Sequence, residues 1–161
     1  MKLKRQRLSK THWDSVIIGY KEKEIDDFDS PSEVSDIVEG VRSLLLSNHL
    51  QVHNDFLPIH IIEYLPGDKS KLKPHVDSVK FSGGIVAGLS LGAERVMRLS
   101  TASDEEGGNE KKIVDVVLPV GSLYVLEKEA RYDMAHEMLP FEGEDGEEGE
   151  GRIAYIFRDR K

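Results

Sequence analysis

The chain has 161 residues, 39% of them hydrophobic, which is the usual size of one compact domain with its own core. The formal net charge is −8 and there is no cysteine. This composition gives no general support for nucleic-acid binding, and it excludes a disulfide framework and a thiolate metal site. A bound metal would need His, Asp or Glu ligands. No apolar run approaches the ~20 residues of a membrane-spanning helix.

The N-terminal third contains one predicted helix. Residues 1–12 form a basic lead-in, and residues 13–25 read as a short strand or turn. Ser30 can then cap a helix, because Pro31 suits its first turn and Glu33 completes a capping box. Apolar residues at helical spacing predict one buried stripe before the helix ends near Asn48. The stripe residues are Val34, Ile37, Val38, Val41, Leu44 and Leu45.

From about residue 57 the pattern changes to short β-like runs separated by turn signals. The predicted strands are residues 58–65, 83–92, 95–100, 112–119, 122–127, 134–139 and 152–158. Short strands after one helix predict a mainly β sandwich or jelly roll, with the N-terminal helix as a buttress. We expect one domain over residues 1–161, with a mobile acidic loop at 141–151.

The stretch KPHVDS, residues 73–78, contains the first candidate for chemistry. Two imidazoles and one carboxylate on one side of a metal form the facial triad of non-haem Fe(II) oxygenases. In a strand, residues two apart project to the same side, so His75 and Asp77 could supply two of these ligands. By itself the motif is also compatible with a polar turn. His136, in the run MAHEML, is the candidate third ligand or a half-buried strand histidine.

Two arginines follow in the run RIAYIFR. Arg152 and Arg158 are six residues apart, so they lie on one face of a predicted strand. Inside an apolar barrel they would need an anion, and a dicarboxylate suits the planar fork of arginine. Taken alone, Arg152 could instead face solvent. The order H-x-D, H, R-x5-R is much less common by chance than any of its parts.

This order resembles that of the AlkB family of Fe(II)/2-oxoglutarate-dependent dioxygenases. Several segments are similar to the mitochondrial branch of that family, and together they cover the chain nearly end to end. They are HWDSVIIGYKEKE (12–24), KPHVDSVKFSGGIVAGLSL (73–91), VMRL (96–99), GSLYVLEKEARYDMAHE (121–137) and RIAYIFR (152–158). The resemblance implies a double-stranded β-helix (jelly roll) core, with Fe(II), O2 and 2-oxoglutarate as co-substrate.

Carried onto this sequence, the family's iron ligands fall on His75, Asp77 and His136. The 2-oxoglutarate arginines fall on Arg152, which would grip the distal carboxylate, and on Arg158.

The resemblance also points to tyrosines. Tyr124 would donate a hydrogen bond to 2-oxoglutarate, although a strand tyrosine is more often part of a core. Tyr64 occupies the position of a second co-substrate tyrosine. Arg131 and Tyr132 either line the substrate mouth or fix a loop.

The implied reaction couples decarboxylation of 2-oxoglutarate to hydroxylation or demethylation, and N-methylated mitochondrial RNA is the expected substrate. Residues 48–72 lack a basic-aromatic lid, and the acidic run at 141–151 would oppose nucleic acid on its side. A protein or small-molecule hydroxylase in cell-death or fatty-acid pathways therefore remains an alternative, as does a non-enzymatic interaction protein. We expect a monomer in the mitochondrial matrix, and the basic lead-in is too short for a full presequence.

Overall fold

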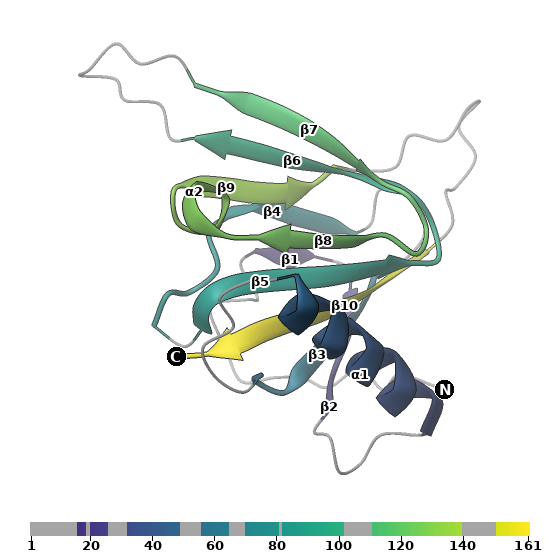
Figure 1. Cartoon of the computed structure of the whole chain (residues 1–161). Helices are drawn as coiled ribbons and strands as arrows, with labels where there is room; N and C mark the ends of the chain where they lie inside the picture. Colours follow the sequence, from purple (N-terminus) through teal and green to yellow (C-terminus); the bar gives the residue numbers. More distant parts are fainter. Residues whose placement is uncertain are drawn as a thin grey trace.

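Two five-stranded sheets face each other and form the body of the molecule (Figure 1). The computed structural model describes residues 16–18, 20–25, 32–48, 56–64, 70–80, 82–101, 111–139 and 151–161. The first sheet runs in the order β1 (Ile17–Ile18), β4 (Lys71–His75), β9 (Met134–Met138), β6 (Arg95–Thr101) and β7 (Ile113–Leu118). The second runs β2 (Tyr20–Ile25), β3 (Ile59–Tyr64), β10 (Arg152–Arg160), β5 (Ser82–Leu91) and β8 (Leu123–Leu126). Neighbouring strands are antiparallel, which confirms the predicted jelly roll.

The seven predicted strands are all present, with ends within two residues of those expected. The segment 13–25 is more divided than predicted, because β1 pairs with β4 while β2 pairs with β3 in the other sheet. Strand β4 is not among the predicted strands. Its only apolar residue besides Pro74 is Leu72, which lies between two lysines, so no clear alternation marks it.

Helix α1 (Ser32–Ser47) covers the outer face of the second sheet, as Figure 1 shows for β3, β10 and β5. The prediction of six buried positions was wrong for two of them, since Ile37 is 39% exposed and Leu44 is 50% exposed. A flat sheet contacts only a narrow strip of a helix, and Val34, Val38, Val41 and Leu45 fill that strip.

The helix ends as predicted. The side-chain amide of Asn48 donates to the carbonyl of Leu44 over 2.7 Å and satisfies a terminal acceptor. The proposed cap Ser30 and the acidic run at 141–150 lie outside the described residues. A second helix, α2 (Lys128–Tyr132), was not predicted. Neither helix in the described part of the chain is long and apolar enough to cross a bilayer.

Alternation along the strands separates two cores. On β10, Ala154 and Ile156 face the space between the sheets, whereas Tyr155 and Phe157 face α1. Arg152 and Arg158 share the parity of Ala154 and therefore point between the sheets. The predicted common face of the two arginines is confirmed, and it is the interior face.

Candidate metal and co-substrate site

The pairing of β4 with β9 brings two histidines together. His75 is the direct cross-strand partner of His136, and their ring centroids lie 4.2 Å apart. These residues are 61 positions apart in the chain, so only the fold makes them neighbours. The backbone carbonyl of Lys73 lies 2.9 Å from Nδ1 of His75, so Nε2 is the ring nitrogen on the side of Asp77.

Asp77 completes the group from just beyond the end of β4. It is 4% exposed, and its Oδ1 lies 3.6 Å from Nε2 of His75. One ligand atom from each of His75, Asp77 and His136 falls within 4.8 Å of the other two, so the group could hold a metal ion. The expectation that strand alternation alone aligns the first two was wrong, because only His75 is part of the strand.

Charges around the group suit a divalent cation. Burial opposes ionisation of Asp77, but the Arg158 guanidinium and the two imidazoles hold the pKa of that carboxyl well below its usual range. Burial, reinforced by His75, lowers the pKa of His136 to about 4, so its ring is neutral at pH 7. Oδ1 of Asp77 is buried and has no hydrogen-bond partner among the described residues. An ionised carboxylate with an open oxygen beside two imidazoles is a ligand set that fits Fe(II).

Arg152 places an unsatisfied cation between the sheets. The side chain is 1% exposed, and its Nε donates to Oγ of Ser90 over 3.0 Å. Its Nη1 and Nη2 are buried and have no hydrogen-bond partner in the part of the chain that the structure describes. Arg95 is also buried; desolvation and then the charge of Arg152 lower its pKa. Two buried guanidinium groups that repel each other favour binding of an anion.

Two tyrosines connect Arg152 to the candidate metal ligands. Its guanidinium lies 5.1 Å from the ring centroid of Tyr64. Tyr64 and Tyr124 line the same cleft as the three candidate ligands and Arg158, whereas Arg152 itself is not part of the cleft wall. The cleft opens to solvent, and about 310 Å³ of space lies within it and at its mouth.

Both phenols are protonated at neutral pH. Burial raises the pKa of Tyr124 to about 12, although Arg152 opposes the shift, and burial likewise raises the pKa of Tyr64. Each phenol is therefore available as a hydrogen-bond donor.

Gly88 on β5 makes room for the ring of Tyr124, because a Cβ at position 88 would lie 2.3 Å from Cζ of Tyr124. Sequence reasoning missed Gly88, Ser90 and Arg95, although the small residues along β5 were a usable signal for the first two.

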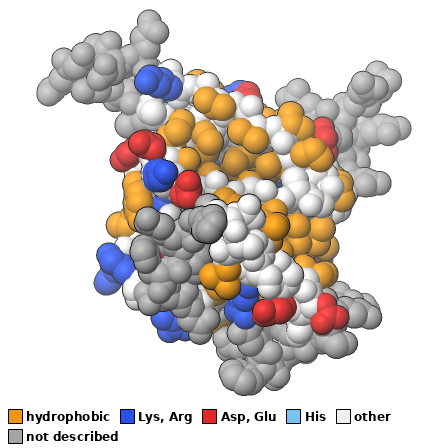
Figure 2. Space-filling model, viewed as in Figure 1, with side chains coloured by type: hydrophobic (Ala, Val, Ile, Leu, Met, Phe, Trp, Pro, Cys, Tyr) orange, Lys and Arg blue, Asp and Glu red, His pale blue; other side chains and the backbone are white. Residues whose placement is uncertain are grey.

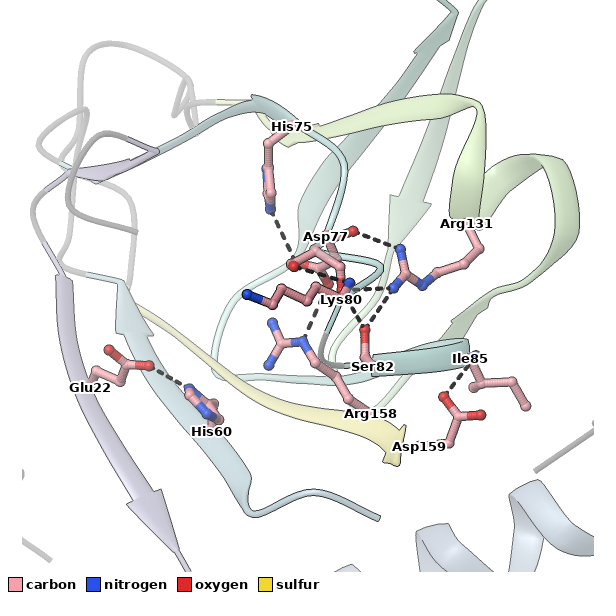
Figure 3. A network of polar contacts seen from close by, with 11 residues as sticks. Glu22, His60, His75, Asp77, Lys80, Ser82, Ile85, Arg131, Arg158 and Asp159 are labelled. Atoms are coloured by element: carbon pink, nitrogen blue, oxygen red, sulfur yellow. Dashed lines mark hydrogen bonds and ion pairs between the residues drawn. The ribbon is translucent and has the colours of Figure 1, made fainter. Parts of the chain in front are cut away.

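Of the two interpretations of Arg131, the structure favours the one in which it fixes a loop. Its guanidinium donates to the carbonyls of Asp77 and Ser78 and to Oγ of Ser82 (Figure 3). Tyr132 is 47% exposed, and its hydroxyl lies 3.5 Å from the carbonyl of Gly83.

Comparison with known sequences agrees with this geometry. The model of the 2OG-Fe(II) oxygenase superfamily matches residues 1–158. The mouse protein "Alpha-ketoglutarate-dependent dioxygenase alkB homolog 7, mitochondrial" is 36% identical over 137 residues, which are 85% of this chain and 57% of the relative. Its bovine counterpart is 36% identical over 94% of this chain and 62% of the relative. The chain thus spans about three fifths of these relatives, and the resemblance to AlkB proteins is confirmed.

Solved structures support the fold. A Pseudomonas putida prolyl-4-hydroxylase superposes with a TM-score of 0.57 at 20% identity, covering 89% of this chain and 70% of the other. A prolyl hydroxylase from Trichoplax adhaerens superposes with a TM-score of 0.55 at 14% identity, covering 88% of this chain and 64% of the other. The jelly roll, the His-Asp-His group and the family match agree: the chain belongs to the 2OG-Fe(II) oxygenase superfamily.

Proposed function

We propose that this chain is an Fe(II)/2-oxoglutarate-dependent dioxygenase. In this proposal His75, Asp77 and His136 hold Fe(II), and Arg152 holds the distal carboxylate of 2-oxoglutarate. The observation that carries it is the buried Arg152 guanidinium in the same interior as the three ligands, whose Nη1 and Nη2 lack hydrogen-bond partners within the described ranges. Bound Fe(II) would supply the redox chemistry that couples loss of carbon dioxide from 2-oxoglutarate to oxidation of a C–H bond.

The protein's own groups prepare this chemistry. Asp77 is ionised and His136 is neutral at pH 7, so neither must lose a proton to bind metal. Arg158 approaches Oδ2 of Asp77 to 3.4 Å, which leaves Oδ1 for the metal. The phenols of Tyr64 and Tyr124 remain protonated and can donate to a bound carboxylate. Apolar side chains line the rest of the cleft, and this low-dielectric surrounding strengthens each of these contacts.

We propose N-methylated RNA in mitochondria as the substrate of this protein, acting as a monomer. Support comes from the resemblance to AlkB proteins and from two relatives named as mitochondrial. The test is succinate release with Fe(II) and 2-oxoglutarate across a panel of methylated and unmethylated transcripts. The expected result is release that depends on methylation in the wild type and is absent in His136→Ala. Equal release by wild type and variant would refute the assignment of the site.

A specific observation favours a second candidate, oxidation of an apolar polypeptide segment. The register continues from His136 on β9 to Leu99 on β6 and then to Val114 on β7, so these side chains share the interior face. Val114 is 49% exposed, and Figure 2 shows apolar side chains gathered over β6, β7 and β8. Strands are ~4.8 Å apart, so this apolar shelf (Leu99 and Val114) begins beside the candidate metal site. Aliphatic residues accept aliphatic side chains, whereas unpaired bases prefer aromatic platforms.

Adding apolar and N-methylated peptides to the panel separates the candidates. Succinate release with methylated RNA alone supports demethylation, and release with peptides alone supports hydroxylation. If the wild type releases no succinate either alone or with any member of the panel, the remaining function is that of a non-enzymatic binding protein.

A further inference from the structure

Arg131 is a buried cation to which the proposed reaction gives no role. It lies in α2, between β8 and β9, and is 2% exposed. Burying a guanidinium is unfavourable unless its donors are satisfied. The pKa of Arg131 is lowered by burial, while the negative charge of Asp77 opposes that shift. The position of this cation therefore requires a structural reason.

The two terminal nitrogens of Arg131 donate to the chain that carries Asp77, whereas its Nε is buried without a hydrogen-bond partner among the described residues. Nη1 donates to the carbonyl oxygen of Asp77 over 2.8 Å. Nη2 donates to Oγ of Ser82 over 2.6 Å and to the carbonyl oxygen of Ser78 over 3.3 Å. Ser82 Oγ in turn donates to the Ser78 carbonyl over 3.0 Å, so the guanidinium and one hydroxyl grip the loop together (Figure 3).

These hydrogen bonds hold a stretch of backbone that is no longer paired with a neighbouring strand. Strand β4 ends at His75, and residues 76–78 have no regular structure. Among the described residues, the carboxylate of Asp77 has only two long contacts, from His75 Nε2 to Oδ1 over 3.6 Å and from Arg158 Nε to Oδ2 over 3.4 Å. The direction of this carboxylate therefore depends on the backbone that carries it. Arg131 fixes that backbone directly, by bonding the carbonyl of Asp77 itself.

We propose that Arg131 is a positioning residue for Asp77: its bonds to the carbonyls of Asp77 and Ser78 and to Ser82 Oγ aim the carboxylate toward the two imidazoles, while Arg131 itself is not a metal ligand. The inference rests on the proposed role of Asp77 as a metal ligand. Residues that orient metal ligands typically change metal affinity by about 10–100-fold when removed. Helix α2 also leads directly into β9, so one short segment sets both His136 and the backbone of Asp77.

The test is a titration of metal-stripped protein with Co(II), followed by its visible absorption bands, which report the coordination geometry. Arg131→Met removes the hydrogen-bond donors and the charge, and Arg131→Lys keeps the charge but loses the planar, two-pronged donor geometry of the guanidinium. Ser82→Ala removes one partner while Arg131 stays in place. Asp77→Ala is the reference for loss of a ligand. Arg98→Gln is the matched control, because it deletes an arginine that pairs with Asp115 on the other face of the sheet.

We expect Arg131→Met to weaken Co(II) binding by about 10–100-fold and to alter the absorption bands, with smaller changes in Arg131→Lys and Ser82→Ala. Arg98→Gln should match the wild type. Wild-type affinity and bands in every folded Arg131 and Ser82 variant, together with loss of binding in Asp77→Ala, would overturn this inference alone. Equal binding by wild type and Asp77→Ala would overturn the proposed metal site and the inference with it. If Arg131→Met does not fold, Arg131→Lys and Ser82→Ala decide the matter.

Discussion

At the scale of single residues, Arg152 shows how this interior is prepared for a ligand at the expense of its own stability. A buried guanidinium with two unpaired nitrogens destabilises the ligand-free fold, and Arg95 adds repulsion from nearby. An arriving carboxylate removes both problems, so the same feature that weakens the empty protein strengthens the complex. Such opposition between stability and binding is expected at functional sites.

Replacing Arg152 with methionine should therefore stabilise the empty protein and abolish binding of 2-oxoglutarate. Relief of the unpaired donors should contribute about 1–3 kcal/mol, or roughly 2–10 °C in Tm for a domain of this size. Differential scanning fluorimetry with and without 2-oxoglutarate measures both effects. Arg152→Lys, which keeps the charge and loses the fork, should bind 2-oxoglutarate weakly. A destabilised Arg152→Met that still responds to 2-oxoglutarate would contradict the assignment.

His136 should make the metal-free protein less stable in mild acid. The pKa of its ring is about 4 when folded, against an ordinary 6.5, so between these values the unfolded chain binds the proton and the folded one does not. Stability is then complete above pH 6.5 and falls, by up to about 3 kcal/mol, as the pH drops to 4. The Asp77 carboxyl does not contribute in this window, because its pKa is lowered from an ordinary value that is already 3.8.

Urea denaturation of the metal-free protein at pH 7 and pH 5 measures this loss. His136→Gln should flatten the difference between the two conditions, since its amide does not titrate. An unchanged difference in that variant would show that another group is responsible.

At the scale of elements, Gly88 on β5 and Tyr124 on β8 form a matched pair. They are cross-strand partners, and the Tyr124 ring occupies the space that a side chain at Gly88 would need. Gly88→Ala should push the phenol away from the cleft and raise the KM for 2-oxoglutarate several-fold, because the displaced atoms are the movable end of the ring. Gly84→Ala on the same strand meets only Tyr132 Oη at 3.8 Å and should behave as the wild type.

Tyr124→Phe completes a double-mutant cycle for this pair. If displacement of the hydroxyl explains the effect of Gly88→Ala, the substitution should add little in the Tyr124→Phe background. Full additivity of the two effects on KM would contradict that explanation.

Strand β7 offers a test of the apolar shelf with its own control. Val114 faces the interior side of the sheet, and its neighbour Ile113 faces the opposite side with similar exposure, 49% against 51%. If an apolar substrate lies on the shelf, Val114→Lys should raise the KM for that substrate about 10-fold or more, the cost of burying an apolar chain against a charge. Ile113→Lys should leave that KM unchanged, and neither variant should alter uncoupled turnover of 2-oxoglutarate. Equal effects of the two lysines would exclude the shelf as a binding surface.

The strands and the arginine face were predictable because period-2 patterns survive in the sequence from residue 58 onward. Strand β4 was not predictable, because Pro74 and two lysines obscure its alternation, although it carries His75. The chain order of the ligands suggested the site, but the direct pairing of His75 with His136 depends on register, which single-strand patterns do not encode. The hydrogen bond from Arg131 to the carbonyl of Asp77 joins residues 54 positions apart, so no local sequence pattern predicts it.

At the scale of the whole molecule, the core between the sheets and the core under helix α1 have different roles. Helix α1 and the outer core stabilise the second sheet from behind, while the inner core is interrupted by charged residues on both sheets. An interior with buried Asp77, Arg152 and Arg95 cannot be at its most stable when empty. Ligand binding should thus contribute a large share of the stability of the working protein.

This dependence predicts an ordered thermal response to ligands. Mn(II) at 100 times its Kd should stabilise the protein by about 2.7 kcal/mol, which for this chain length raises the Tm by roughly 5–10 °C. Addition of 2-oxoglutarate should raise the Tm further only when metal is present, because part of its binding would use open positions on the metal, and EDTA should reverse both shifts. Arg152→Met should keep the shift caused by metal and lose the one caused by 2-oxoglutarate, while His136→Ala should lose both. A 2-oxoglutarate shift of full size in EDTA would show that the two ligands bind independently, and the shared site would then be wrong.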